Sequence, residues 1–394
     1  MHENRIREDH MYRFLALAMA AVPLVLASGT ARADDRLIDR PKPKLFATLP
    51  DGIILPEGIA ANPANGDIYV GTFAPGGTNW LLRYAANGKL LATLEIGAEP
   101  LLGLAYEPVT DMLYVATVGA FAGTASRVQR VAADLAPGTV QDVADIPLVG
   151  APPDRIVANP DGSEDVIAFG NNAAVPNSLA FDGFGNLYVS DSFQGAIFLV
   201  NDAVGCVDPA TCIVDTVIHD GLLATAGHPP FGANGLALDA DGSALFIANT
   251  GDDRVLRLDL ELGMLSVFAE SLNGADGIAF DGNGRLWVAA NQADRVFALD
   301  DAGRPVAELG GFEGIDKDGL PRGLLFPASL AIHGKEMFVT NLAITLTDAV
   351  GDEWGGRGLA LYSLADSAAG PELGRSRSVR VGASGRSPRP AERP

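Results

Sequence analysis

Cysteine and histidine are scarce in this chain of 394 residues, which contains two cysteines and five histidines. Both cysteines, Cys206 and Cys212, lie in the segment GCVDPATC, and the chain has no Cys-x-x-Cys pair and no Cys-x-x-Cys-His haem signature. A redox or metal role for the cysteines is therefore not indicated. An even cysteine count is typical of disulfide pairing in exported proteins, so we expect a Cys206–Cys212 disulfide at a hairpin end.

Positive charge is also in short supply, with 28 Lys and Arg against 49 Asp and Glu and a net charge of −21. Because segments 1–33 and 371–394 carry net charges of +1 and +4, residues 34–370 carry −26. Such a surface repels nucleic acid and anionic lipid, which excludes both as expected partners. It suits cation binding, although acidic surfaces commonly serve solubility alone.

No apolar run reaches the roughly 18 residues that a membrane-spanning helix needs. The run from Phe14 to Ala27 follows a basic region and precedes Ala31-Arg32-Ala33, a small-x-small cleavage pattern. We interpret residues 1–33 as a secretory signal peptide, with a membrane anchor as the alternative, and Met11 is a second possible start. The mature protein is then expected to be soluble and periplasmic or secreted.

What the chain has in abundance is a repeated phrase of short strands and Asp/Asn/Gly turns. Each copy has an apolar strand, an alternating strand such as LYVSDS or LWVAAN, a third strand such as RVFALD, and a more variable fourth strand. Six copies begin at Leu55, Pro100, Val175, Gly232, Gly274 and Phe326. Four strands in roughly 40–55 residues predict a propeller blade, so we expect an all-β, six-bladed β-propeller with four-stranded antiparallel blades. A β-sandwich or two separate β domains is the alternative.

The predicted domain organisation is a signal peptide at 1–33, a propeller at 34–370, and a disordered Arg/Ser/Pro-rich tail at 371–394. The last repeat stops at its third strand, and KLFATL at Lys44–Leu49 is expected to supply the outer strand that closes the ring. A longer stretch between the second and third repeats indicates an insertion, roughly Ala133 to Ala174.

One position varies within an otherwise repeated scaffold. It is the residue before Gly in the ADG of the fifth repeat, together with the equivalent residue of each other repeat. We call it the axial position, because the innermost strand of each blade lines the central tunnel of a propeller, and we expect this residue just before that strand, at the tunnel mouth. Its six occupants are Glu57, Leu102, Asn177, Asn234, Asp276 and Ala328. Two carboxylates and two amides suit Ca²⁺, which takes six to eight oxygen ligands, and leave positions for water or substrate. The alternative is plain turn chemistry, since Asn and Asp before Gly are common in turns.

The series PEG, PNS, ANG and ADG at these positions resembles the senescence marker protein/gluconolactonase (regucalcin-like) family, whose calcium-dependent six-bladed propellers are related to the paraoxonases. The blades themselves look like NHL repeats, and the resemblance covers about 55–364. It implies that four residues match the ligands of the catalytic calcium: Glu57, Asn177, Asn234 and Asp276. It also implies lactone or ester hydrolysis. The chain departs from the family in Ser178 after Asn177, in the insertion, and in lacking an identifiable sugar-binding Arg.

In this interpretation Ca²⁺ polarises a lactone carbonyl and Asp276 acts as base, with Glu57 as the alternate. Asn177 and Asn234 would hold the metal and donate hydrogen bonds from their NH₂ groups to an oxyanion. Residues that end the second strands are expected around the tunnel mouth, as second-layer or substrate contacts: Asp191, Asn249, Asn291 and Asn341. His228, six residues before Asn234, is a further candidate base, although a lone His in a Pro-rich loop is more often a surface residue.

Two other functional classes stay open at this point. A non-catalytic NHL-type propeller would bind a peptide or glycan on its face, because fold alone does not determine function. A lyase or a quinone-dependent dehydrogenase on the same architecture has no cofactor signature in the sequence. The leading prediction is an exported calcium-dependent lactonase that acts on a small molecule as a monomer.

Overall fold

A computed structural model describes residues 38–39, 43–170, 173–317, 320–344 and 360–365. All of them belong to one compact unit, Leu37–Pro394. The expected signal peptide (1–33) and the tail (371–394) lie outside the described residues. Within the described residues, no helix has the length and apolar character needed to cross a membrane.

The fold is built from four-stranded antiparallel sheets. In the three sheets formed by the second, third and fourth repeats, each strand pairs with the next strand of the chain. The second sheet contains β7 (Leu101–Glu107), β8 (Met112–Thr117), β9 (Arg127–Ala132) and β10 (Gln141–Asp145). The third contains β13 (Pro176–Phe181), β14 (Leu187–Asp191), β15 (Ala196–Val200) and β16 (Val214–His219). The fourth contains β17 (Ala233–Leu238), β18 (Ala244–Asn249), β19 (Arg254–Asp259) and β20 (Met264–Glu270).

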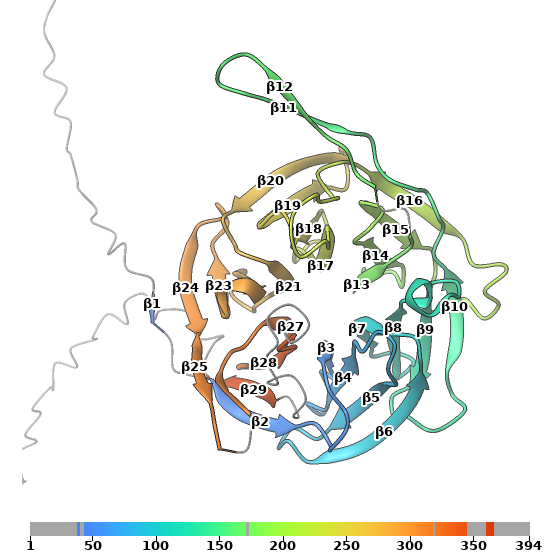
Figure 1. The fold of residues 1–394 in the computed structure, drawn as a ribbon. Coiled ribbons are helices and arrows are strands. Elements are labelled where there is room, and N and C mark those ends of the chain that lie inside the picture. The colour runs from blue at the N-terminus through green and yellow to red at the C-terminus, as the bar shows by residue number, and fades with distance from the viewer. Residues whose placement is uncertain (1–37, 40–42, 171–172, 318–319, 345–359, 366–394) are drawn as a thin grey trace, which may run out of the picture. The chain divides into compact units, whose positions relative to one another are not determined.

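The first and last four-stranded sheets lie side by side (Figure 1). The first contains β3 (Pro56–Ala61), β4 (Ile68–Thr72), β5 (Asn79–Tyr84) and β6 (Leu90–Gly97). The last contains β27 (Pro327–His333), β28 (Glu336–Asn341), β29 (Ala360–Ala365) and, on its outer edge, β2 (Lys44–Thr48). The antiparallel β2–β29 pairing confirms that the segment at Lys44–Leu49 supplies the closing strand.

The remaining large sheet has five strands, because β1 (Ile38–Asp39) pairs in parallel with the outer edge of β24. Its antiparallel part contains β21 (Ala275–Phe280), β22 (Leu286–Ala290), β23 (Arg295–Leu299) and β24 (Pro305–Gly310). The prediction of six four-stranded blades is therefore wrong in its count. The described parts of the chain contain five four-stranded antiparallel sheets, and the sixth large sheet has five strands because β1 is added to it.

The innermost strands contact one another in chain order, from β3 through β7, β13, β17, β21 and β27 and back to β3 (Figure 1). Apolar clusters fill the space between neighbouring sheets. Tyr69, Leu101 and Leu113 pack between the first two sheets, and Trp287 packs against Met337 and Val339 of the last. Both faces of each sheet are thereby buried, so the inner strand ends are held rigidly around a common axis.

The insertion is shorter than expected, because residues 141–145 form β10, the ordinary fourth strand of the second sheet. The additional chain follows β10 and forms a separate hairpin of β11 (Arg155–Ala158) and β12 (Glu164–Ile167), which extends outward in Figure 1. A second short hairpin of β25 (Phe312–Ile315) and β26 (Pro321–Gly323) lies between β24 and β27 in the chain. The Cys206–Cys212 disulfide is confirmed in the β15–β16 connection, with 5.8 Å between the two Cα atoms.

Candidate functional site

The axial residue is the second residue of every innermost strand. The sequence had suggested instead that it comes just before the strand. The strand begins one residue earlier because its first residue pairs with the end of the second strand, as Pro56 does with Thr72. The pairing register then shifts at the axial position in all six sheets. A bulge of this kind re-aims a side chain. The axial side chains are therefore strand residues and not the turn residues of the alternative interpretation.

Four of the six axial residues are followed by Gly, and the other two by Ser178 and Ser329. Close packing between neighbouring inner strands requires these glycines. A Cβ atom on Gly103 would lie 2.3 Å from the carbonyl oxygen of Asn177, and one on Gly235 would lie 2.3 Å from that of Asp276. Distances this short do not occur in real structures, so a larger residue would displace the next axial residue. The repeated Gly thus brings the axial residues close to one another.

Five of the six axial residues line one small cavity, and they include all four predicted calcium ligands: Glu57, Leu102, Asn177, Asn234 and Asp276. The cavity has a volume of about 40 Å³, which exceeds the roughly 10–15 Å³ needed for one water molecule. Ala328 is buried but is not among the lining residues. Apart from Asn291 and Thr250, the rest of the lining is apolar.

The two carboxylates in this cavity are almost completely buried, with exposed fractions of 3% for Glu57 and 4% for Asp276. Oε2 of Glu57 and Oδ1 of Asp276 have no hydrogen-bond partner. Burial raises the pKa of Asp276 to about 7, against the hydrogen bonds from Asn291 and Asn234. Burial, and then repulsion from Asp276, also raises the pKa of Glu57. No Lys, Arg or His lines the cavity within the described residues, so nothing there neutralises the pair.

Two hydroxyl groups orient the axial amides. Ser192 Oγ donates to the carbonyl of Ala233 over 2.7 Å and therefore accepts from Nδ2 of Asn177 over 2.9 Å. The next sheet repeats the arrangement, with Thr250 Oγ1 donating to the carbonyl of Ala275 and accepting from Nδ2 of Asn234. An amide whose nitrogen is held in this way turns its oxygen to the opposite side.

These contacts change the expected role of the amides. Their NH₂ groups were expected to stabilise an oxyanion, but one N–H of each group already donates to a hydroxyl, and Asn234 also donates to Asp276. The amide oxygens are the atoms left for a ligand, and they add to the two unpaired carboxylate oxygens. Ser192 and Thr250 were not predicted from the sequence, although they directly follow Asp191 and Asn249, which were.

The four residues expected around the mouth separate into one that lines the cavity and three that hold the surrounding backbone. Asn291 donates from Nδ2 to Asp276 Oδ2 over 2.9 Å, and its own Oδ1 is buried without a partner. Asp191 accepts from the backbone N–H groups of Val175, Phe193 and Gln194.

Asn249 and Asn341 have the same structural function as Asp191. Asn249 Nδ2 donates to the carbonyls of Leu222 and Ala224, and Asn341 accepts from the N–H of Leu325. Both residues end the second strand of their sheet, as Asp191 does, whereas Asn291 stands one residue beyond β22. Because successive side chains of a strand point to opposite faces, this difference of one residue turns these side chains away from the side that Asn291 occupies.

His228 is exposed, and the structure assigns it one polar contact, in which its backbone carbonyl accepts from Nε2 of Gln292 over 3.1 Å. The neighbouring Pro229 lines the cavity, but His228 does not.

The donor set fits a hard divalent cation better than a transition metal. In the described part of the chain, no group of three or more His, Cys, Asp and Glu side chains is placed to hold a metal. The cavity offers two carboxylates and two amide oxygens instead, and all four are hard oxygen donors. Ca²⁺ accepts such a mixed set together with water, whereas Zn²⁺ selects nitrogen and sulfur. The two unpaired carboxylate oxygens also match the charge of a divalent ion.

Comparison with known proteins extends the resemblance found in the sequence. The family model described as SMP-30/Gluconolactonase/LRE-like region matches residues 228–310. The match is a likeness of that region alone, about a fifth of the chain. Among the axial residues, Asn234 and Asp276 fall inside that region, and Glu57 and Asn177 lie outside it.

A curated protein to which this chain is similar is the lactonase drp35 of Staphylococcus epidermidis. The two are 26% identical over 155 residues, or 37% of this chain. The match spans 45% of the relative's length, less than half of that protein.

Two solved structures resemble this chain in fold. Regucalcin from Agrobacterium tumefaciens, described as a calcium-binding protein, has a TM-score of 0.53 and 15% identity, covering 83% of this chain and 94% of that one. A luciferin-regenerating enzyme has a TM-score of 0.52 and 15% identity, covering 79% of this chain and 91% of that one. At such identity the likeness concerns the fold alone.

Proposed function

We propose that this protein is an exported calcium-dependent hydrolase of lactones, in which the five-stranded sheet counts as the sixth blade of the propeller. The observation that carries the proposal is the axial cavity, where two buried carboxylate oxygens lack partners beside two amides with oriented oxygens. The lactonase relative supports the reaction class. Glu57, Asn177, Asn234 and Asp276 would hold the ion.

When bound, calcium would polarise the substrate carbonyl and offset the repulsion between the carboxylates. Asp276 is the proposed base, because its carboxylate is buried in the cavity and Oδ1 has no hydrogen-bond partner. Asn291 donates to Oδ2 of Asp276, which leaves Oδ1 to accept the proton of the attacking water. The hydroxide portion adds to the lactone carbonyl, the ring C–O bond breaks, and the released alkoxide takes up a proton to give the hydroxy acid. Glu57 is the alternate base.

The proposal extends to location and assembly. The Cys206–Cys212 disulfide and the absence of a spanning helix among the described residues are compatible with export. We expect a periplasmic or secreted monomer that acts on a small molecule and binds no nucleic acid.

The first experiment is the metal content of residues 34–394, purified with calcium and then desalted. We expect about one calcium ion per chain together with chelator-sensitive lactone hydrolysis. Asp276→Asn and Glu57→Gln should lose both properties, because each removes one of the two charges that hold the ion. Asp301→Asn, an exposed acid outside the cavity, is the matched control and should retain both.

Two results would contradict the proposal. One is full metal content and turnover in Asp276→Asn with an unchanged melting temperature. The other is a calcium-free protein that hydrolyses no lactone and binds a peptide or glycan equally well with and without chelator. That second result would support the non-catalytic propeller instead.

A further inference from the structure

The axial cavity has two chemically different sides. The residue that immediately follows the second strand of each sheet is polar in three neighbouring sheets, where it is Ser192, Thr250 or Asn291. In the other three sheets the same position is apolar, with Phe73, Val118 or Leu342. Phe73 and Leu342 line the cavity, and so does the apolar axial residue Leu102. The partners that orient the axial polar groups thus come from one half of the axis, and apolar side chains occupy the other half.

A closed cycle of four phenylalanine rings adds to the apolar lining and reaches from the first two sheets to the third and fourth. The ring centroids are 6.1 Å apart for Phe73 and Phe121, 5.8 Å for Phe121 and Phe193, 5.5 Å for Phe193 and Phe231, and 6.2 Å for Phe231 and Phe73. Three of the rings follow the second strand of the first, second and third sheets, and Phe231 precedes the inner strand of the fourth. Phe73 and Phe231 line the cavity, and the other two rings pack behind them.

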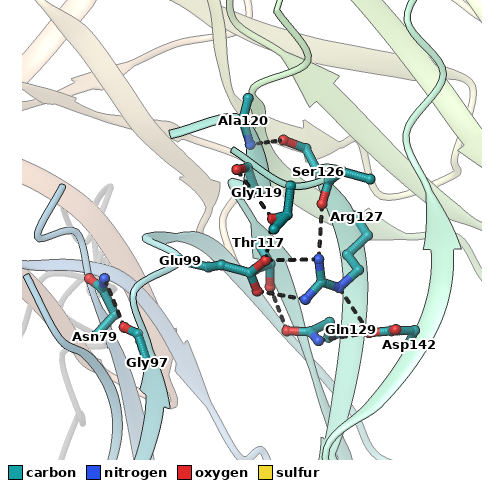
Figure 2. Close-up of polar contacts among 12 residues, drawn as sticks. Asn79, Gly97, Glu99, Thr117, Gly119, Ala120, Ser126, Arg127, Gln129 and Asp142 are labelled. Atoms are coloured by element: carbon teal, nitrogen blue, oxygen red, sulfur yellow. Dashed lines mark hydrogen bonds and ion pairs between the residues drawn. The ribbon is translucent and has the colours of Figure 1, made fainter. Parts of the chain in front are cut away.

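The cycle is held in place by polar contacts around the 3₁₀ helix η1 (Gly119–Ala122), which carries Phe121. Figure 2 shows these contacts, in which the N–H of Ala120 donates to Ser126 Oγ over 3.0 Å. Beside them, Arg127 makes two hydrogen bonds to the carboxylate of Glu99 and one to Asp142. A bidentate ion pair of this kind fixes the loop geometry. The position of Phe121 is therefore specified by its surroundings.

Polar groups that would recognise hydroxyl groups of a substrate are few. The cavity has no Arg, Lys or His within the described residues, and the hydroxyl of Thr250 is occupied by its bonds to Ala275 and Asn234. A polyhydroxylated lactone would lose its hydration shell against phenylalanine without replacement hydrogen bonds. An alkyl or aryl substituent would instead gain free energy from burial.

We propose that the preferred substrate is a lactone with an apolar side chain, whose carbonyl faces the axial oxygen atoms and whose side chain contacts the phenylalanine cycle. The inference rests on the proposed hydrolase function and specifies its substrate class. It assigns Phe73 and Phe231 as specificity-determining residues.

Three δ-lactones with the same six-membered ring test the inference: δ-valerolactone without a substituent, δ-decanolactone with a pentyl chain, and polyhydroxylated δ-gluconolactone. Each buried CH₂ group increases kcat/KM about fourfold. We expect δ-decanolactone to exceed δ-valerolactone by about tenfold or more, and δ-gluconolactone to be the poorest substrate. Preference for δ-gluconolactone would overturn the inference and leave the hydrolase function intact. No turnover of any of the three would overturn the hydrolase function and the inference with it.

Variants separate specificity from folding. Phe231→Ala should lower kcat/KM for δ-decanolactone about tenfold and change that for δ-valerolactone by less than about threefold. Phe184→Ala is the matched control, because Phe184 is 89% exposed and lies outside the cavity. Phe231→Leu keeps an apolar side chain and should recover part of the loss, and calcium content reports whether the site is intact. An equal loss for both lactones in a calcium-loaded Phe231→Ala protein would refute the assignment.

Discussion

Replacing Ser192 by Ala tests whether an oriented amide matters for calcium binding. Ser192 Oγ accepts from Asn177 and donates to Ala233, and both distances are below 3 Å. The variant removes the acceptor that holds the amide nitrogen of Asn177. The amide can then rotate and present NH₂ instead of oxygen to the ion, which disfavours a cation.

The size of the effect follows from these contacts. Each lost hydrogen bond contributes about 0.5–1.5 kcal/mol, so the free energy of unfolding should fall by about 2–3 kcal/mol with the buried carbonyl of Ala233 left unpaired. Loss of a group that orients a ligand typically lowers metal affinity about 10–100-fold. A purely structural role for Ser192 would reduce the melting temperature and leave the calcium affinity unchanged.

Calorimetric titration of the chelator-treated protein with calcium, well below its melting temperature, measures this affinity. Ser192→Thr is the matched control, because it keeps the hydroxyl and copies Thr250 of the next sheet. We expect Ser192→Thr to bind calcium like the natural protein. An affinity for Ser192→Ala within about twofold of the natural protein, or an equal loss in both variants, would refute the reasoning.

Three further predictions concern stability. Gly235→Ala should unfold at clearly lower urea concentration, because its Cβ would meet the carbonyl of Asp276, whereas Gly282→Ala has no atom within 4 Å and should not. Burial raises the pKa of Asp191 to about 6. The contribution of Asp191 to the free energy of unfolding is therefore complete below about pH 4 and is lost as the pH rises through 6. The stability advantage of the natural protein over Asp191→Asn should therefore shrink between pH 4 and pH 7 in urea titrations. In the metal-free protein, Asp276→Asn should raise the melting temperature, since it removes repulsion with Glu57, and an unchanged or lower value would argue against a charge conflict.

The propeller and the placement of the axial residues were predictable because the repeat records them directly. A strand that returns in every repeat must occupy equivalent places, so the residue that varied at the start of this strand had to lie near the axis. The closing strand at Lys44–Leu49 was predictable by the same counting, because the last repeat was one strand short. Whether Glu57, Asn177, Asn234 and Asp276 bind calcium is still the proposal stated above.

Contacts between different repeats were not predictable from the pattern. Ser192 and Thr250 matter because their hydroxyls reach the next sheet, and a single repeat contains no signal for that contact. The four phenylalanines come from connections of four different sheets and share no spacing. The extent of the insertion was misjudged because β10 has a weak strand pattern, and the fifth strand β1 is only two residues long.

The closing strand also sets the order in which the candidate site can be completed. Glu57 is the first axial residue to be synthesised, and its carbonyl accepts a hydrogen bond from Thr340, 283 residues later in the chain. The partner of β2 is β29, which ends at Ala365. A chain that stalls or is cut before Thr340 would lack both this hydrogen bond to Glu57 and the closing partner of β2. Only a chain synthesised through β29 would have both the last cavity-lining residues and the β2–β29 pairing that closes the ring.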